Sequence, residues 1–119
     1  MADHNELGKK GEQIAIDFLV KKKYKILEKN YRDLKLEVDI IAQKENILVA
    51  VEVKTRTTDF FGNPQEFVDP KKIKRLLSAI DNYVIEKELD VDVRFDIIAI
   101  IHYKQQTKIE HLKDAFLYF

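Results

Sequence analysis

The sequence contains no cysteine, and no apolar run in it approaches the roughly 20 residues that a membrane helix needs. Without cysteine, neither a disulfide framework nor a thiolate metal site can form, which is compatible with a reducing cytoplasm. The polar first stretch, MADHNELGKKGEQ, has no apolar segment of the signal-peptide type. We therefore expect a soluble cytoplasmic protein without a membrane partner.

Several catalytic motifs are absent as well. The three histidines, His4, His102 and His111, are scattered and form no zinc-ligand spacing. There is no glycine-rich phosphate loop and no Ser/His/Asp pattern. Net charge is zero, with 21 basic and 21 acidic residues, whereas phosphate binding favours a basic surface. Lysines nevertheless cluster in KKKYK (21–25) and KKIKR (71–75), so composition leaves the partner open.

The composition is that of a globular protein, because 45% of the 119 residues are hydrophobic. This length fits one domain over residues 1–119. Hydrophobic periodicity predicts a first helix over 5–22, with Glu12 at the border of its apolar stripe. The stripe consists of Leu7, Gly11, Ile14, Ala15, Phe18 and Leu19.

A second helix is predicted from Asp69, as N-cap, and Pro70, as first helical residue, to about Glu88. Its apolar stripe is expected to be Ile73, Leu76, Leu77, Ile80, Tyr83 and Val84. Between the helices, residues 24–32, 36–43 and 47–56 have the pattern of three strands in an antiparallel meander. Residues 57–69 are interpreted as a mobile loop.

The almost continuous apolar run over 93–103 predicts a strand buried on both faces, in the middle of the sheet. Because a helix precedes it, this strand should lie parallel to the third strand. Residues 108–119 are expected to add a last short strand and an aromatic closing segment. The predicted fold class is therefore α/β, with a mixed central sheet covered by helices.

Alternation along the second and third strands predicts an acidic patch. The polar faces are expected to carry Glu37 and Asp39, and then Glu52 and Lys54. The opposite faces would carry Val38 and Ile40, and then Val49, Val51 and Val53. Since a tight turn joins the two strands, the polar faces could coincide, and Glu12 could reach them from the helix border.

Grouped carboxylates raise one another's pKa, and a divalent cation removes this conflict. We expect Asp39 and Glu52 to ligate Mg²⁺ directly, with the backbone carbonyl of Val53 as a third ligand. Lys54 would orient or activate the attacking water and stabilise charge on a phosphate. The alternative is that Glu52 and Lys54 form an ordinary ion pair on a solvated sheet face.

Other charged residues have two interpretations each. Arg56 would contact phosphate or be an exposed charge, and Lys72 would face the cleft or extend along its helix to solvent. Glu37 would support the ligands or be merely solvated, and Arg32 is a candidate partner for one of the acids. Asp96 is either a buried, hydrogen-bonded acid or an acid of the site.

The order of the motifs resembles known families. EVDIIA (37–42) followed by VEVKTR (51–56) resembles the D-x(n)-E-x-K signature of the restriction-endonuclease-like superfamily, also written PD-(D/E)xK. The flanking pieces resemble, in order, the YraN-type uncharacterised bacterial family, which is similar to archaeal Holliday junction resolvases. These pieces are GKKGEQIAIDFL (8–19), NYR (30–32), VDPKKIKRL (68–76), RFDIIAI (94–100) and HLKDAF (111–116). The match covers nearly the whole chain.

The resemblance implies a three-layer nuclease fold, Mg²⁺ or Mn²⁺, and a branched or structured DNA substrate. By motif position it maps metal ligation to Asp39 and Glu52, the catalytic lysine to Lys54, and an accessory acid to Glu12. The leading hypothesis is thus a metal-dependent DNA endonuclease, selective for DNA structure. Cutting both arms of a junction would need a homodimer, although the sequence shows no clear dimer patch.

Two other function classes remain open. One is a nucleic-acid-binding or interaction module that keeps the fold without turnover, which zero net charge and small size favour. The other is a hydrolase acting on something other than nucleic acid, which would need a small closed pocket in place of an open groove.

Overall fold

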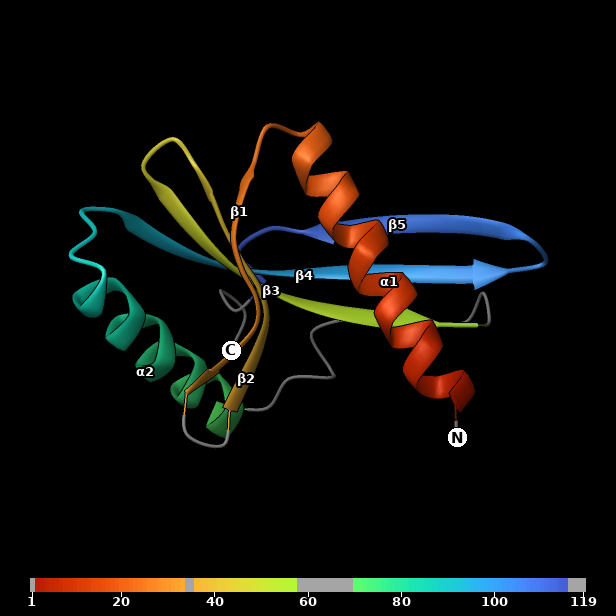
Figure 1. Cartoon of the computed structure of the whole chain (residues 1–119), viewed down its shortest axis with the longest axis horizontal. Helices are drawn as coiled ribbons and strands as arrows, with labels where there is room; N and C mark the ends of the chain where they lie inside the picture. The colour runs from red at the N-terminus through yellow and green to blue at the C-terminus, as the bar shows by residue number, and fades with distance from the viewer. Residues whose placement is uncertain (1, 34–35, 58–69, 116–119) are drawn as a thin grey trace.

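The computed structural model describes residues 2–33, 36–57 and 70–115, with side chains from Gly8 onward (Figure 1). Its elements are α1 (Ala2–Lys21), β1 (Lys25–Asp33), β2 (Leu36–Lys44), β3 (Ile47–Arg56), α2 (Pro70–Glu86), β4 (Asp92–Tyr103) and β5 (Gln106–Leu112). Apart from Thr57, the predicted loop over 57–69 lies outside the described residues, and so does the expected N-cap, Asp69, at its end. The predicted aromatic end over 116–119 also lies outside them. None of the described helices is long and apolar enough to cross a membrane.

The strands form one five-stranded sheet in the order β1-β2-β3-β4-β5. The predicted antiparallel meander of the first three strands is confirmed. The chain then passes through α2 and returns as β4, which lies parallel to β3 with Val51 opposite Asp96. β5 pairs antiparallel with β4, so the predicted last short strand is confirmed, and β4 is an interior strand, although β3 occupies the middle of the sheet.

The two helices cover opposite faces of the sheet. Val49 and Val51 of β3 pack in one core with Ala15 of α1. Ala50, which points to the other face, packs in a second core with Leu76 of α2. Figure 1 shows α1 crossing in front of β3 and β4. Each fully buried aliphatic side chain in these cores contributes about 1.5–3 kcal/mol, so the two cores hold both helices on the sheet.

The predicted apolar stripe of α2 was wrong at one position. Leu77 is 51% exposed, whereas Ala79 is buried beside Leu76 and Ile80. The helix also ends two residues earlier than predicted, because Glu88 has a left-handed φ of 52° that a helix cannot continue through.

The expectation that Val38 and Ile40 share a face was also wrong. Val38 packs in the core under α2, and Ile40 packs in the core under α1. Alternation therefore breaks between Asp39 and Ile40. The β2–β3 pairing also stops here, since its last pair is Ile40 with Val51. The two strands separate beyond this pair (Figure 1), and we call the place where they part, Asp39–Ile40 of β2 and Val51–Val53 of β3, the fork.

Candidate functional site

Asp39 lies at the fork with its carboxylate between the two separating strands. Its Oδ2 accepts a hydrogen bond of 2.8 Å from the backbone N–H of Val53. A continuous β-ladder would pair that part of β3 with the backbone of β2, so the carboxylate replaces a strand neighbour. This bond fixes Asp39 against the backbone of β3.

A glycine brings Glu12 to the fork. A Cβ at Gly11 would collide with Oγ1 of Thr55 and stand 3.2 Å from the Cβ and Cγ2 of the same residue. Glycine therefore lets α1 approach the Thr55 side chain of β3 more closely than a residue with a Cβ would. Because Glu12 is the next residue of α1, the close contact brings its carboxylate to Asp39.

Three carboxylates gather at the fork. In the described part of the chain, ligand oxygens of Glu12, Glu37 and Asp39 lie within 4.8 Å of one another. We call these three residues the acidic cluster. Arg32, which is 77% exposed at its side chain, pairs with Glu37 at 3.1 Å. Arg32 thus reaches one of the acids, as the sequence suggested, from the solvent side.

Asn30, for which sequence patterns predicted no role, joins two members of the acidic cluster. With its amide in the orientation that satisfies both neighbours, Asn30 Nδ2 donates to Glu12 Oε1 and to Glu37 Oε1, each at 3.0 Å. The available signal was the motif NYR, which carries no chemistry of its own. The contact depends on α1, β1 and β2 together, so spacing along the chain could not predict it.

Burial and neighbouring acids raise the pKa of two acids at this site, Asp39 and Glu12. Burial and the neighbouring Glu52 raise the pKa of Asp39 from 3.8 to about 7, against the opposing effect of the Val53 N–H. Burial and Glu37 also raise the pKa of Glu12, although the hydrogen bond from Asn30 lowers it. Raised carboxylate pKa values at neutral pH mark a place where an added positive charge would be favourable.

Glu52 is nearby but is neutralised differently. It is 9% exposed, and its Oε1 lies 2.9 Å from Lys72 Nζ of α2 and 3.3 Å from Lys54 Nζ. Lys72 therefore faces the site and does not simply extend to solvent. The ion pair of Glu52 with Lys54 also exists, but on a largely buried carboxylate and not on a solvated sheet face.

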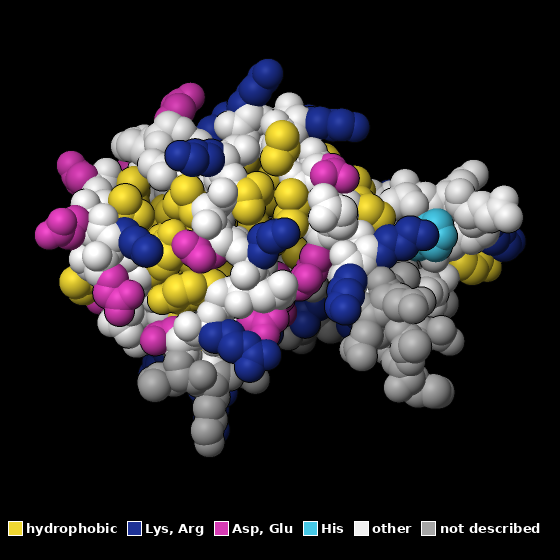
Figure 2. Space-filling model, viewed as in Figure 1, with side chains coloured by type: hydrophobic (Ala, Val, Ile, Leu, Met, Phe, Trp, Pro, Cys, Tyr) yellow, Lys and Arg dark blue, Asp and Glu magenta, His cyan; other side chains and the backbone are white. Residues whose placement is uncertain are grey.

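An open cleft of about 270 Å³ lies at the fork. It is lined by Gly8, Glu12, Asp39, Val53, Lys54, Thr55 and Arg56. Arg56 donates from Nη1 to the backbone carbonyl of Thr55 at 2.9 Å, which holds it at the end of β3. The lining thus combines two acids with two basic side chains. On the face seen in Figure 2, the described Lys and Arg side chains are likewise interspersed with acidic and apolar ones.

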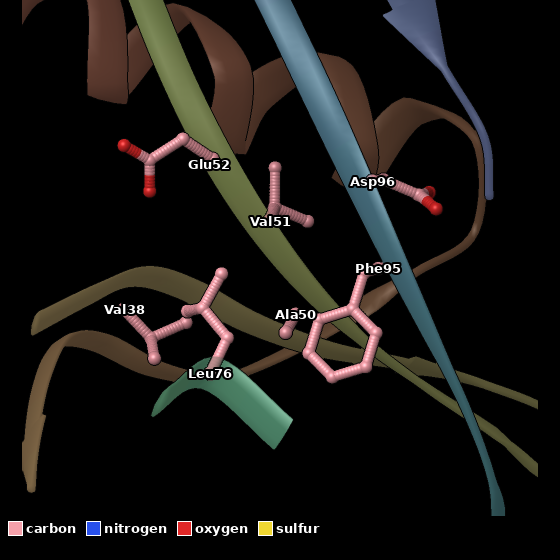
Figure 3. Close-up of a pocket in the computed structure, with 7 residues that line it drawn as sticks. All are labelled: Val38, Ala50, Val51, Glu52, Leu76, Phe95 and Asp96. Carbon is pink, nitrogen blue, oxygen red and sulfur yellow. The ribbon is translucent and has the colours of Figure 1, made fainter. Parts of the chain in front are cut away.

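Asp96 belongs to a different arrangement. It is fully buried, and it accepts two hydrogen bonds of 2.9 Å from Arg94 and lies 2.7 Å from His111 Nε2. Burial alone would raise the pKa of Asp96, but the bonds from His111 and Arg94 outweigh it and lower the pKa. Figure 3 shows Asp96 and Glu52 pointing in opposite directions from β4 and β3. The buried, hydrogen-bonded alternative therefore describes Asp96.

The acidic cluster fits a hard divalent cation by its chemistry, because its ligands are oxygens and two of its acids have raised pKa values. Opposite ligands of an ion with bonds of about 2.1 Å are about 4.2 Å apart. The three ligand oxygens lie within 4.8 Å of one another, a limit that is compatible with ligands of one ion. Cation binding by the predicted pair of Asp39 and Glu52 is less direct, because Lys54 and Lys72 already contact one oxygen of Glu52.

Comparisons with known proteins give a family without an assigned activity. The model of "Uncharacterised protein family UPF0102" matches residues 11–100, which include all four predicted catalytic positions. A UPF0102 protein of Christiangramia forsetii is 64% identical over 119 residues, and one of Flavobacterium psychrophilum is 56% identical over 119 residues, with full coverage of both chains in each case. A UPF0102 protein of Bacteroides thetaiotaomicron is 49% identical over 116 residues, or 98% of this chain and 96% of that protein.

Proposed function

The chain belongs to the uncharacterised protein family UPF0102, the YraN-type family that its motifs predicted, and we propose that it is a divalent-cation-dependent DNA endonuclease with a restriction-endonuclease-like fold. The observation that carries this proposal is Asp39, a carboxylate with a pKa of about 7 at the fork, surrounded by further acids and beside Lys54. The three-layer arrangement of the sheet between α1 and α2 is compatible with that fold.

Mg²⁺ or Mn²⁺ would be held by Asp39 together with Glu12 and Glu37, or with Glu52 and the carbonyl of Val53. When bound, such an ion supplies a water of lowered pKa and neutralises charge on the phosphate. Both sets of ligands share Asp39, so Asp39 is the residue on which cation binding should depend most.

The basic residues have separate roles in this proposal. Lys54 lines the cleft beside Asp39, where its ammonium would stabilise the charge that develops on a phosphate oxygen. Arg56 at the end of β3 and Lys72 on α2 would bind phosphates of the DNA backbone. Glu52 orients both lysines, because one of its oxygens contacts the two ammonium groups.

The preferred substrate in this proposal is branched or structured DNA. The support is the motif resemblance, together with a cleft that is open and so suits a polymer better than a small molecule. Each chain would cut one strand, so cutting two arms of a junction would require a homodimer. In this proposal the enzyme works in the cytoplasm, where bacterial DNA lies.

One observation favours a second candidate, a nucleic-acid-binding or interaction module that keeps the fold without catalysis. The two lysines already neutralise Glu52, so this carboxylate needs no cation. Such a module would use the same basic residues to bind DNA and would leave the phosphodiester intact.

A cleavage assay separates the two candidates. Labelled four-way junction, flap, single-stranded and duplex DNA would be incubated with Mg²⁺, with Mn²⁺ or with chelator. Wild-type protein would be compared with Asp39→Asn and Glu52→Ala, and with Glu110→Gln as a control, because Glu110 is an exposed acid of β5 paired with Lys108.

The nuclease proposal predicts metal-dependent products that both site variants reduce by about 100-fold or more, while the control variant retains cleavage. DNA binding should survive in the Asp39→Asn variant. Absence of cleavage in wild type, with DNA binding that chelator does not change, would reject the nuclease and support the binding module.

A further inference from the structure

Asn30 has an unusual backbone conformation for its position. Seven described non-glycine residues have a positive φ, and six of them lie in turns, whereas Asn30, with φ 52°, lies inside β1. A positive φ is rare for residues with a Cβ, and asparagine is among those that tolerate it best. The chain thus places a left-handed residue where a strand would normally be extended.

This kink coincides with the fork. In the β1–β2 pairing, Lys29 lies opposite Ile40 and Tyr31 lies opposite Val38, which places Asn30 across from Asp39. Alternation in β2 breaks at the same level, between Asp39 and Ile40. Both neighbouring strands therefore depart from regular extended geometry at the acidic cluster.

The side chain of Asn30 uses both of its amide hydrogens there. Nδ2 donates one bond to Glu12 of α1 and one to Glu37 of β2, each at 3.0 Å. Hydrogen bonds to ionised carboxylates are stronger than those between neutral groups, and they favour the charged form. One neutral group thus holds two like-charged side chains from separate elements side by side.

We infer that Asn30 is a positioning residue that assembles the acidic cluster. Its left-handed backbone turns the amide toward Glu12 and Glu37, and the two hydrogen bonds hold these carboxylates next to Asp39. Glycine would supply the backbone conformation without the amide, and alanine would supply neither. The arrangement itself follows from the geometry, and only its consequence for cation binding and cleavage rests on the proposed function.

The first test reads the hydrogen bonds directly, without metal or DNA. In ¹⁵N-labelled protein with chelator, the side-chain amide resonances of Asn30 should shift in the Glu12→Gln variant and, separately, in the Glu37→Gln variant. The Glu110→Gln variant should leave them in place. If neither Glu12→Gln nor Glu37→Gln moves these resonances, Asn30 does not bridge the two acids and the inference is overturned.

The second test separates the amide from the backbone. Mn²⁺ affinity would be measured by calorimetry for wild type, Asn30→Gly and Asn30→Ala, with Lys23→Gly as a control at an exposed turn residue with φ 75°. Asn30→Gly should keep the thermal midpoint close to that of wild type and bind Mn²⁺ about tenfold more weakly. Asn30→Ala should show the same loss of affinity and also a lower midpoint, because it strains the backbone.

The outcomes distinguish this inference from the proposed function. Wild-type affinity in Asn30→Gly, with weaker binding only in Asn30→Ala, would mean that the backbone matters and the amide does not, which would overturn the inference. If wild-type protein binds no Mn²⁺, the proposed function fails, and the amide resonances alone decide whether Asn30 positions the two acids.

Discussion

Asp39 is half-buried and Asp96 is fully buried on the same sheet, and the charges around the two carboxylates are opposite. They are close along β3, because Val53 donates its N–H to Asp39 and Val51 lies opposite Asp96. Asp96 contacts a guanidinium and an imidazole, and its pKa is lowered. Asp39 lies among other acids, and its pKa is raised to about 7.

The difference shows which carboxylate the fold needs for stability. A buried acid that serves the fold is matched by cations of the same chain, as Asp96 is by Arg94. The acids around Asp39 repel one another, which lowers the stability of the folded protein without a cation. Perturbed acids in a cleft are typical of functional sites, so the contrast supports our proposal that Asp39 is the functional residue.

Replacing each of the two acids by its amide should give the largest difference between them. Asp96→Asn should lower the free energy of unfolding by about 3 kcal/mol or more, because Arg94 would keep a buried charge without its anion. Asp39→Asn should not destabilise the metal-free protein, since it removes a repelling charge. Urea unfolding at pH 8 in chelator measures both, and a loss of similar size in the two variants would show that Asp39 is structural as well.

The pH dependence of stability gives the next effect. Because the folded state holds the proton of Asp39 up to a pKa of about 7, against 3.8 as the ordinary value, the free energy of unfolding should fall as pH rises from 4 to 7. The shift corresponds to at most about 4 kcal/mol. We expect about 1–3 kcal/mol, because solvent reaches the cleft.

Asp39→Asn should abolish most of that fall. The lowered pKa of Asp96 acts in the opposite sense, so its stabilisation is present above about pH 4 and is lost as pH falls further. Urea midpoints measured from pH 3 to 8 would show both limbs. A wild-type protein whose stability rises steadily from pH 4 to 7 would contradict the charge assignment at Asp39.

A divalent cation should stabilise the folded protein through Asp39 and not through Asp96, by a smaller amount. For a site with a Kd of about 1 mM, 10 mM Mn²⁺ stabilises the folded state by about 1.4 kcal/mol, which raises the melting temperature by about 3–6 °C. Asp39→Asn should lose this increment, and Asp96→Asn should keep it. Differential scanning calorimetry with and without Mn²⁺ measures it, and an equal increment in Asp39→Asn would place the cation elsewhere.

The smallest effect concerns the lysines on Glu52. Lys72→Ala leaves Lys54 paired with Glu52, whereas loss of Arg94 would leave the buried charge of Asp96 without its guanidinium partner. We therefore expect Lys72→Ala to lower the free energy of unfolding by only about 0.5–1 kcal/mol. DNA binding should weaken with a salt slope reduced by about 1. Fluorescence anisotropy in a KCl series measures this, with the exposed Lys74→Ala of the same helix as control. A larger effect of Lys74→Ala would move the phosphate contact away from Lys72.

Sequence patterns predicted the framework well. The meander could be predicted from period-two alternation and the tight turn after Gln43. The parallel crossover could be predicted from the continuous apolar run of β4. The D-x(n)-E-x-K spacing was enough to bring Asp39, Glu52 and Lys54 into one region. These are local signals, in which each residue is placed mainly by its neighbours along the chain.

The details of the site could not be predicted from such signals. The fork depends on a break of alternation at Asp39–Ile40, which the letters EVDIIA do not encode. Asn30 acts through a left-handed backbone and through acids of two other elements. The partners of Asp96 come from β4 and from the end of β5, so only the assembled sheet shows that His111 contacts it.

The most direct measurement is an anomalous difference map from crystals of the protein grown or soaked with Mn²⁺. We expect a peak at the fork, within bonding distance of the Asp39 carboxylate and of at least one further acid among Glu12, Glu37 and Glu52. The peak should vanish in Asp39→Asn crystals treated in the same way. A map without density at the fork, or a peak that persists in Asp39→Asn, would contradict the assignment of Asp39 as the centre of a cation site.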